Sequence, residues 1–383
     1  MARARLKTKK LLTPELELAL ICSGPEVSAD AKGRLAGIAN GKIDWTLFLK
    51  LVMRHQLFPM IYWRYKERYL PVFPVSVVAE LQKADRMNKI RTMQMTMEMT
   101  ELVRGLAERG ISAIVVKGIP LAQMLYQNIT HRTSNDIDIL VRQDELEAAK
   151  QVLEERGYEA EKEQYCLIHD ALPEWIEQTQ SVACFDARRK IMVDLTICLG
   201  SHGAVIPWEE IEGCIEEIIF AGQMIRVVKK EVLFLHLILH GAGHAWFRLK
   251  WLLDIAYILE KGEISWRELY RLSDKIGVSH IVNQSLLLVH EICGITLPEK
   301  IERKASNSKV AYKLAQQAME LMKISDFNPV KLGPMPPSKT YFLYKKYRFC
   351  MLHSWKQRIQ YGYYEVVNLI MGIGRELSIK ISG

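Results

Sequence analysis

The spacing of apolar residues changes near Gly110 and again near Lys229. Up to Gly110 the spacing is helical, as in residues 45–54 and in a long helix expected from about 76 to 109, which Gly110 can end in the left-handed conformation. Between the two changes, short apolar runs alternate with short helical segments, and after Lys229 the helical spacing returns. We therefore predict an α+β fold, in which a small mixed β-sheet core is flanked by N-terminal and C-terminal helical domains.

This pattern divides the chain into four predicted parts. They are an N-terminal helical region (1–110), an α/β core (111–228), a helical domain (229–330) and a basic, aromatic C-terminal segment (331–383). Within the core the expected order is strand, helix, strand, helix and hairpin. The corresponding ranges are 112–116, 120–126, 136–141, 144–156, and 182–186 with 191–197 around the turn 187–190.

The composition is that of an ordinary folded protein, since 49% of the residues are hydrophobic and 25% are charged. The apolar run 232–239 is much shorter than the roughly 20 residues of a membrane-spanning helix, so no such helix is expected. The basic N-terminus leads into a helix start at Thr13-Pro14-Glu15 and not into a signal peptide. The seven cysteines are scattered and include no CxxC pair, which disfavours a disulfide framework or zinc knuckle and indicates the cytoplasm.

The net charge of +8 is concentrated at the two ends of the chain. Residues 1–10 carry +5, and residues 331–383 carry nine Lys and Arg against two Glu, so the residues between them carry −4. A polyanion-binding groove through the core is therefore not expected, and neither is an extended nucleic-acid partner.

The C-terminal run 341–349 interleaves aromatic and cationic side chains. Two interpretations remain open. In one, this segment contacts a membrane surface or another anionic partner; in the other, it is a helix that covers the core and has a solvated basic face.

Five methionines lie in the long N-terminal helix. Their spacing spreads them around the helix and not along one ligand-binding face, so we expect them to pack in the core, where a flexible thioether fills irregular space. They are Met87, Met93, Met95, Met97 and Met99.

The strand expected at 136–141 carries two carboxylates. Side chains two residues apart share one face of a strand, so Asp136 and Asp138 point the same way and Ile137 points into the protein. An Asp-x-Asp pair is also common at turns and in surface salt bridges. Two divalent ions held by oxygen ligands about 3.5–4 Å apart are, however, a standard arrangement for nucleotidyl transfer. We interpret the pair as ligands of Mg²⁺ or Mn²⁺ that bind a nucleoside triphosphate.

Two features before these aspartates fit a triphosphate. Gly118 lets the backbone approach a phosphate, the helix that follows it favours an anion at its N-terminus, and Lys117 adds a positive charge. A tight turn with a solvated lysine would use the same two residues. The loop before the strand adds the guanidinium of Arg132 and the hydroxyls of Thr133 and Ser134.

A third carboxylate is expected on a neighbouring strand, because two metal ions need more ligands than two side chains supply. Asp194 lies in an apolar strand, where an unpaired carboxylate is costly. The alternative is an ion pair between Asp194 and Arg188 or Arg189 of the turn. Asp186 is a weaker choice for the third ligand because it adjoins that turn.

Three stretches of the core, 110–118, 132–141 and 156–158, resemble the poorly characterised bacterial nucleotidyltransferase family of the polymerase-β-type superfamily. The likeness extends from about residue 45 to 260. Two departures from the superfamily pattern are Ile119, where the superfamily has a serine, and a longer connection to Asp136. In addition, Thr196 stands where an Asp-Leu-His pattern would have a histidine.

The resemblance implies an enzyme that moves a nucleoside monophosphate from a nucleoside triphosphate to an acceptor and releases pyrophosphate. It also implies that Asp136, Asp138 and Asp194 are the catalytic residues and the ligands of two Mg²⁺ or Mn²⁺ ions. Similar enzymes belong to bacterial polysaccharide or peptide-natural-product pathways, so the acceptor is a sugar, peptide, natural product or protein. The alternatives are a pseudoenzyme that keeps the nucleotide pocket as a scaffold, and a metal-dependent phosphodiesterase.

Three histidines, His236, His240 and His244, recur every four residues on one helical face. This spacing can bind zinc, although neither an HExxH pattern nor a cluster of cysteines or carboxylates accompanies it. More often such histidines line a cleft or bond to the backbone. Because Arg248, Lys250 and Asp254 follow closely, we interpret His240 and His244 as part of a cleft wall that faces the nucleotide, with a cation of Arg248 or Lys250 in contact with phosphate.

Overall fold

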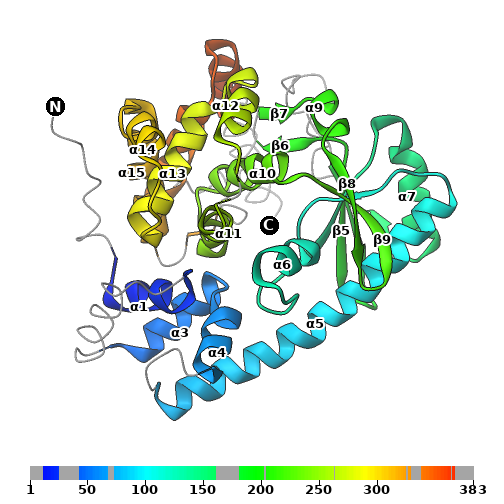
Figure 1. Cartoon of the computed structure of the whole chain (residues 1–383), viewed down its shortest axis with the longest axis horizontal. Helices are drawn as coiled ribbons and strands as arrows, with labels where there is room; N and C mark the ends of the chain where they lie inside the picture. The colour runs from blue at the N-terminus through cyan, green and yellow to red at the C-terminus, as the bar shows by residue number, and fades with distance from the viewer. Residues whose placement is uncertain are drawn as a thin grey trace, which may run out of the picture.

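A seven-stranded mixed sheet and a large group of helices lie side by side in the computed structural model (Figure 1). The strand order is β3-β4-β5-β2-β1-β9-β8, and β6 and β7 form a separate pair. The predicted α+β class is confirmed. The structure describes residues 12–25, 43–67, 73–160, 181–201, 204–262, 264–324, 327–328, 338–363 and 365–366.

The strands at the centre of the sheet combine parallel and antiparallel pairing. β2 is parallel to β5 and antiparallel to β1, and β1 is parallel to β9. The pairs β3–β4, β4–β5 and β8–β9 are antiparallel, and β4–β5 is the predicted hairpin. The strands are β1 (Ile114–Val115), β2 (Asp136–Leu140), β3 (Glu159–Ala160), β4 (Ser181–Asp186), β5 (Ile191–Thr196), β6 (Leu199–Ser201), β7 (Ala204–Ile206), β8 (Ile215–Phe220) and β9 (Gln223–Val228).

One apolar cluster lies between the sheet and two helices, α5 (Val75–Glu108) and α7 (Leu146–Glu155). Ile139 of β2 packs in this cluster with Leu102 of α5 and Val152 of α7. The burial of alternate residues along β5 follows from the twofold repeat of a strand, which sends successive side chains to opposite faces.

A larger cluster joins the N-terminal and C-terminal helices to each other and to the opposite face of the sheet. It includes Phe48 from the first group of helices, Leu252 and Leu314 from the second, and Leu140 from β2. The division into four predicted parts stays a prediction. The helices are α1 (Pro14–Ser23), α3 (Trp45–Arg54), α4 (Phe58–Lys66), α6 (Ile119–Tyr126), α9 (Trp208–Glu212), α10 (Lys230–Gly243), α11 (Leu249–Glu260), α12 (Trp266–Lys275), α13 (Ser279–Cys293), α14 (Glu299–Ser306), α15 (Lys309–Met322) and α16 (Lys339–Met351).

Helix α5 connects the two clusters. It has 34 residues, close to the predicted range, and Gly110 follows its end with a φ of 74°. Leu81 near its start lies in the larger cluster, whereas Met95 and Met99 lie in the sheet cluster. One continuous helix therefore ties the helical part of the molecule to the sheet (Figure 1).

The prediction that all five methionines of this helix pack in the core is wrong for three of them. Met87, Met93 and Met97 are 61, 54 and 70% exposed. Only one side of α5 meets the rest of the protein, and residues on its other side remain in solvent whatever their type.

Helix α16 packs three large side chains inward. Tyr344, Tyr347 and Met351 are buried in the larger cluster, so this helix covers the core as one of the two interpretations predicts. Phe342 on its outer side is 57% exposed. In the described part of the chain, none of the helices combines the length and apolar character needed to cross a membrane.

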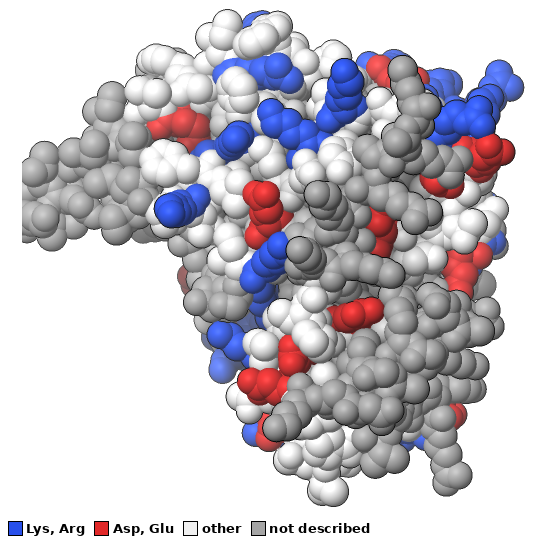
Figure 2. Space-filling view, turned by 90° about the vertical axis from the view of Figure 1, so that its left-hand side faces the viewer, with Lys and Arg blue, Asp and Glu red and all other residues white. Residues whose placement is uncertain are grey.

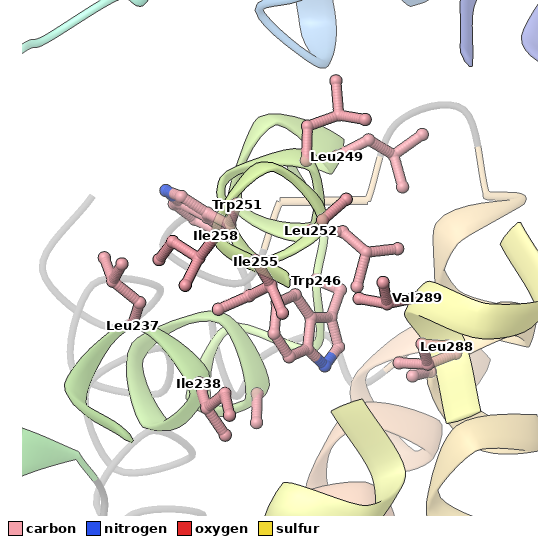
Figure 3. Packing of buried hydrophobic residues seen from close by; sticks show 14 of the residues in the cluster. Leu237, Ile238, Trp246, Leu249, Trp251, Leu252, Ile255, Ile258, Leu288 and Val289 are labelled. Atoms are coloured by element: carbon pink, nitrogen blue, oxygen red, sulfur yellow. The ribbon is translucent and has the colours of Figure 1, made fainter. Parts of the chain in front are cut away.

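Trp246 fills the space where α10, α11 and α13 meet (Figure 3). Ala245 and Trp246 have φ values of 50° and 55°, so the connection from α10 to α11 makes a left-handed turn that directs the indole back onto α10. A methyl group added at Gly241 would lie 2.3 Å from an indole carbon, Cζ3. Glycine is the residue that leaves room for the ring.

We predict that Gly241→Ala lowers the free energy of unfolding by about 1–3 kcal/mol, because the added methyl group displaces the indole of Trp246. Gly105→Ala is the matched control: its methyl group would make an ordinary 3.6 Å contact with Val152, and alanine favours the helix. Urea denaturation of the two variants measures the difference. Equal losses of stability would contradict this account.

Candidate active site

Three carboxylates meet at the centre of the sheet. Asp136 and Asp138 lie on β2 and Asp194 lies on β5, and the parallel register pairs Asp138 directly with Asp194. One ligand atom from each residue lies within 4.8 Å of the other two. Among the described residues, no other three His, Cys, Asp or Glu side chains offer ligand atoms this close together. The three predicted metal ligands are therefore neighbours in space.

Strand alternation separates these acids from the core. Ile137 lies between the two aspartates of β2, Val193 and Leu195 flank Asp194 on β5, and all three apolar side chains are buried in the sheet cluster. The carboxylates consequently share the opposite face of the sheet.

Lys117 offsets part of the negative charge of the three carboxylates. Its Nζ lies 2.8 Å from Oδ1 of Asp138. Burial alone would lower the pKa of Lys117, but the charges of Asp138, Asp136 and Asp194 outweigh burial and raise this pKa, so the amine stays cationic. Burial, reinforced by the two neighbouring carboxylates, raises the pKa of Asp138 to about 7. Oδ2 of Asp138 is buried and accepts no hydrogen bond.

Cations keep Asp136 ionised. Burial opposes its ionisation, but Lys117, Lys250 and Arg132 together hold the pKa of its carboxyl below the usual value. An ionised carboxylate beside a buried, unpaired oxygen of Asp138 is a donor set of the kind that hard divalent cations prefer. The residues present therefore fit a divalent metal ion.

Gly118 brings the backbone at the start of α6 close to the aspartate strand. Its φ of 76° is in the left-handed region that favours glycine. A methyl group added there would lie 3.6 Å from Oγ of Ser134 and 3.7 Å from the carbonyl oxygen of Asp136. Lys117, Gly118 and Ser134, predicted from separate stretches, thus lie together beside the carboxylates.

Arg132 makes a buried ion pair with Asp254 of α11. Its Nε donates to the two oxygens of Asp254 at 3.0 and 3.1 Å, and its Nη2 lies 3.0 Å from Oδ2. The hydroxyl of Tyr126 donates to the same carboxylate at 2.8 Å. The side chains of Arg132 and Asp254 are 5% and 0% exposed. This pair fastens the loop to the helices, and a contact of Arg132 with phosphate stays a prediction.

Lys250 of α11 donates hydrogen bonds to Thr133, the residue that follows Arg132 in the loop before β2. Its Nζ donates to the carbonyl oxygen and to Oγ1 of Thr133, both at 3.1 Å, and Thr133 Oγ1 donates to Oε1 of Gln56 at 2.9 Å. Burial and the like charges of Arg132 and Arg248 lower the pKa of Lys250 well below its usual value. A phosphate bound nearby would offset these like charges and favour the protonated amine.

His236 and His240 lie on α10 and His244 directly follows it, and the rings of His240 and His244 are close to Trp251. The ring centroids of His240 and His244 are 4.8 Å apart, and they lie 4.9 and 5.3 Å from that of Trp251. Burial and the charge of Lys117 lower the pKa values of His236 and His244 to about 3, and the pKa of His240 is also well below its usual value. These histidines form no three-ligand group among the described residues, so the geometry gives the zinc alternative no support.

Arg248 stacks on two aromatic rings, those of Phe247 and Trp251. Its guanidinium carbon lies 5.0 Å from the ring centre of Phe247 and 5.8 Å from that of Trp251. Burial lowers the pKa of Arg248, and the charge of Asp136 opposes that change. Arg248 is therefore close enough to the carboxylate site for the two charges to interact.

Asp186, the weaker choice for a third metal ligand, shapes the hairpin turn. Its Oδ1 accepts hydrogen bonds from the backbone N–H groups of Arg188 and Arg189 at 2.8 and 2.9 Å. Its Oδ2 lies 3.1 Å from Nε of Arg189. Asp186 is thus the carboxylate that pairs with the turn.

Helix α5 supports the loop from its other side. Nδ2 of Asn88 donates to the carbonyl oxygen of Thr130 at 2.8 Å, and Arg91 donates to the carbonyl oxygen of Asn135 at 3.5 Å. Sequence reasoning missed these contacts and that of Gln56. The partners are 42, 44 and 77 residues apart in the chain, and such contacts leave no local pattern.

The sheet and its carboxylates indicate an enzyme that handles phosphate groups, and the comparison with known families agrees. The family described as "Uncharacterised nucleotidyltransferase" matches residues 41–294, which include the whole seven-stranded sheet and its supporting loop. The chain belongs to this family. It is a nucleotidyltransferase, a transferase of phosphorus-containing groups, and the family implies a nucleoside triphosphate as substrate. No curated protein and no solved structure matches the chain.

We predict that Asp254→Asn lowers the free energy of unfolding by about 3–5 kcal/mol, because it leaves the guanidinium of Arg132 buried without its counter-ion. The matched control is Glu155→Gln, which removes an exposed ion pair with Arg109 and should cost less than about 1 kcal/mol. Guanidinium denaturation measures both variants. A loss below 1 kcal/mol for Asp254→Asn would show that the buried pair does not fasten the loop.

Proposed function

We propose that this enzyme transfers a nucleoside monophosphate from a nucleoside triphosphate to an acceptor and releases pyrophosphate, in a reaction that requires a divalent metal. The observation that carries the proposal is the group formed by Asp136, Asp138 and Asp194, in which a buried oxygen of Asp138 has no hydrogen-bond partner. A buried carboxylate oxygen of this kind is costly unless a cation binds to it.

Asp136, Asp138 and Asp194 are the residues that would hold two Mg²⁺ or Mn²⁺ ions. When bound, the ions supply positive charge to the triphosphate and polarise the reacting phosphate. Lys117 neutralises Asp138 in their absence and is 14% exposed. It is therefore placed to exchange one anionic partner, the carboxylate, for another, a phosphate oxygen.

We assign the triphosphate to the groups around this lysine. The backbone at Gly118 and the N-terminus of α6 favour an anion, and the hydroxyl of Ser134 is close enough to Gly118 to donate to the same oxygens. We assign the rest of the nucleotide to His240, His244 and Arg248, which lie close to Trp251.

Lys250 and Arg132 act in this proposal by shaping the loop. Lys250 donates to Thr133, next to Ser134, and adds its charge to the triphosphate site. Arg132 sets the position of the loop through Asp254.

In the reaction, an oxygen of the acceptor forms a bond to the α-phosphorus while the bond from this phosphorus to the bridging oxygen of the β-phosphate breaks. Pyrophosphate leaves with the electron pair of the broken bond. We assign the proton of the acceptor hydroxyl to Asp194, the third carboxylate of this group. The acceptor belongs to the sugars, peptides, natural products or proteins.

We predict that Asp136→Asn with Asp138→Asn lowers transfer at least about 100-fold, because charge stabilisation in the transition state is lost. Each nucleoside triphosphate, labelled at the α-phosphate, is incubated with Mg²⁺ and panels of the four acceptor classes. The measurements are labelled acceptor and released pyrophosphate. Asp144→Asn removes a carboxylate that is 77% exposed and serves as the control.

Unchanged transfer by the double variant would sink the proposed function. Triphosphate binding that depends on metal, without pyrophosphate release on any panel, would favour a nucleotide-binding scaffold. Consumption of nucleotide without an acceptor would favour a phosphodiesterase.

A further inference from the structure

A row of large apolar side chains is exposed on the last described helical segment. Residues 355–363 and 365–366 are helical. Trp355, Ile359, Tyr363 and Val366 are 71, 70, 60 and 56% exposed. Their spacing of four, four and three residues places them on one face of a helix. We call these four side chains the C-terminal stripe.

The opposite side of this segment is fastened to the protein, so the stripe has a defined orientation. Tyr361 is buried against Leu352, and the guanidinium of Arg348 lies 5.7 Å from its ring. Beyond it, Glu365 pairs with Lys345 at 2.6 Å. Because the helix docks through these residues, its four apolar side chains face away from the core.

The surface around the C-terminal stripe is strongly basic. Residues 338–366 contain six Lys and Arg against one Glu, for a net charge of +5. The guanidinium of Arg358 lies 5.2 Å from the ring of Trp355 and 5.8 Å from that of Phe349, so a cation is held directly on the exposed aromatics. On the side of the molecule where Figure 1 draws α14 and α15, Figure 2 shows Lys and Arg side chains over the upper part of the surface.

Helix α5 shows that exposed apolar residues do not always come with positive charge. Four exposed apolar residues of this helix, Met87, Ile90, Met93 and Met97, also lie on one face. Residues 75–108, however, contain five Lys and Arg against five Asp and Glu, so this helix has no net charge. The C-terminal stripe differs because it combines Trp and Tyr, an apolar row and an excess of cations. This is the combination that lies in the headgroup region of an anionic bilayer.

We propose that the C-terminal stripe and its flanking cations bind the surface of an anionic phospholipid bilayer. Trp355, Ile359, Tyr363 and Val366 would enter the boundary between headgroups and acyl chains, and Lys346 and Arg358 would contact lipid phosphates. A nucleic acid would use the cations but leave the apolar row in water, so lipid fits the surface better. The proposal is independent of the proposed function, because none of these residues belongs to the carboxylate site.

The test is sedimentation of the full chain with phosphatidylcholine vesicles, with and without phosphatidylglycerol. We expect binding to the vesicles that contain phosphatidylglycerol, and weaker binding at high salt. Trp355→Ser with Ile359→Ser should weaken binding at least about tenfold, and Tyr363→Ser with Val366→Ser should have a similar effect. The control, Ile90→Ser with Met97→Ser on α5, should bind like the unchanged chain. Circular dichroism checks that all three variants are folded.

Several results would overturn the proposal. Equal sedimentation of the unchanged chain with both kinds of vesicle, or with neither, would contradict it. A dimer that depends on the stripe in light scattering, without vesicle binding, would assign this surface to a second copy of the chain. Binding only by a variant that lacks residues 367–383 would show that these residues cover the stripe. RNA that displaces vesicles from the stripe variants as well as from the unchanged chain would show that vesicle binding depends on the cations alone.

Discussion

Repulsion among three carboxylates is the constraint on which the candidate active site depends. The sheet register places Asp138 beside Asp194 and two residues from Asp136, so their charges cannot separate without breaking strand pairing. Lys117 pairs with Asp138 and compensates for part of this charge, but burial and the two neighbouring carboxylates still raise the pKa of Asp138. A divalent ion would relieve the repulsion and satisfy the open oxygen of Asp138 at the same time.

The loop before the aspartates is held by three parts of the molecule. Asn88 reaches it from α5, Gln56 from the end of α3, and Asp254 and Lys250 from α11. The sheet supplies the carboxylates, but helices on both sides fix the loop that carries Ser134. The helical regions are thus part of the site and not only a cover for the sheet, which agrees with the extent of the family match from 41 to 294.

The parts of the fold that were predictable from sequence are those with a local cause. Alternation of Asp and Ile predicts both the strand β2 and the shared face of Asp136 and Asp138, and glycine after Lys117 predicts a turn at which α6 begins. The ion pair of Arg132 with Asp254 joins residues 122 positions apart, and no local pattern could reveal it. The exposed methionines of α5 were mispredicted for a related reason: the side of a helix that meets solvent depends on where the rest of the chain packs.

The proposed function depends on the binding of divalent metal by Asp136, Asp138 and Asp194 together. The most direct measurement is anomalous scattering from a crystal grown with Mn²⁺ and a non-hydrolysable nucleoside triphosphate analogue. The account predicts manganese peaks among these three carboxylates, in contact with the triphosphate. Nucleotide bound elsewhere, or manganese on the histidines of α10 with none at the carboxylates, would contradict it.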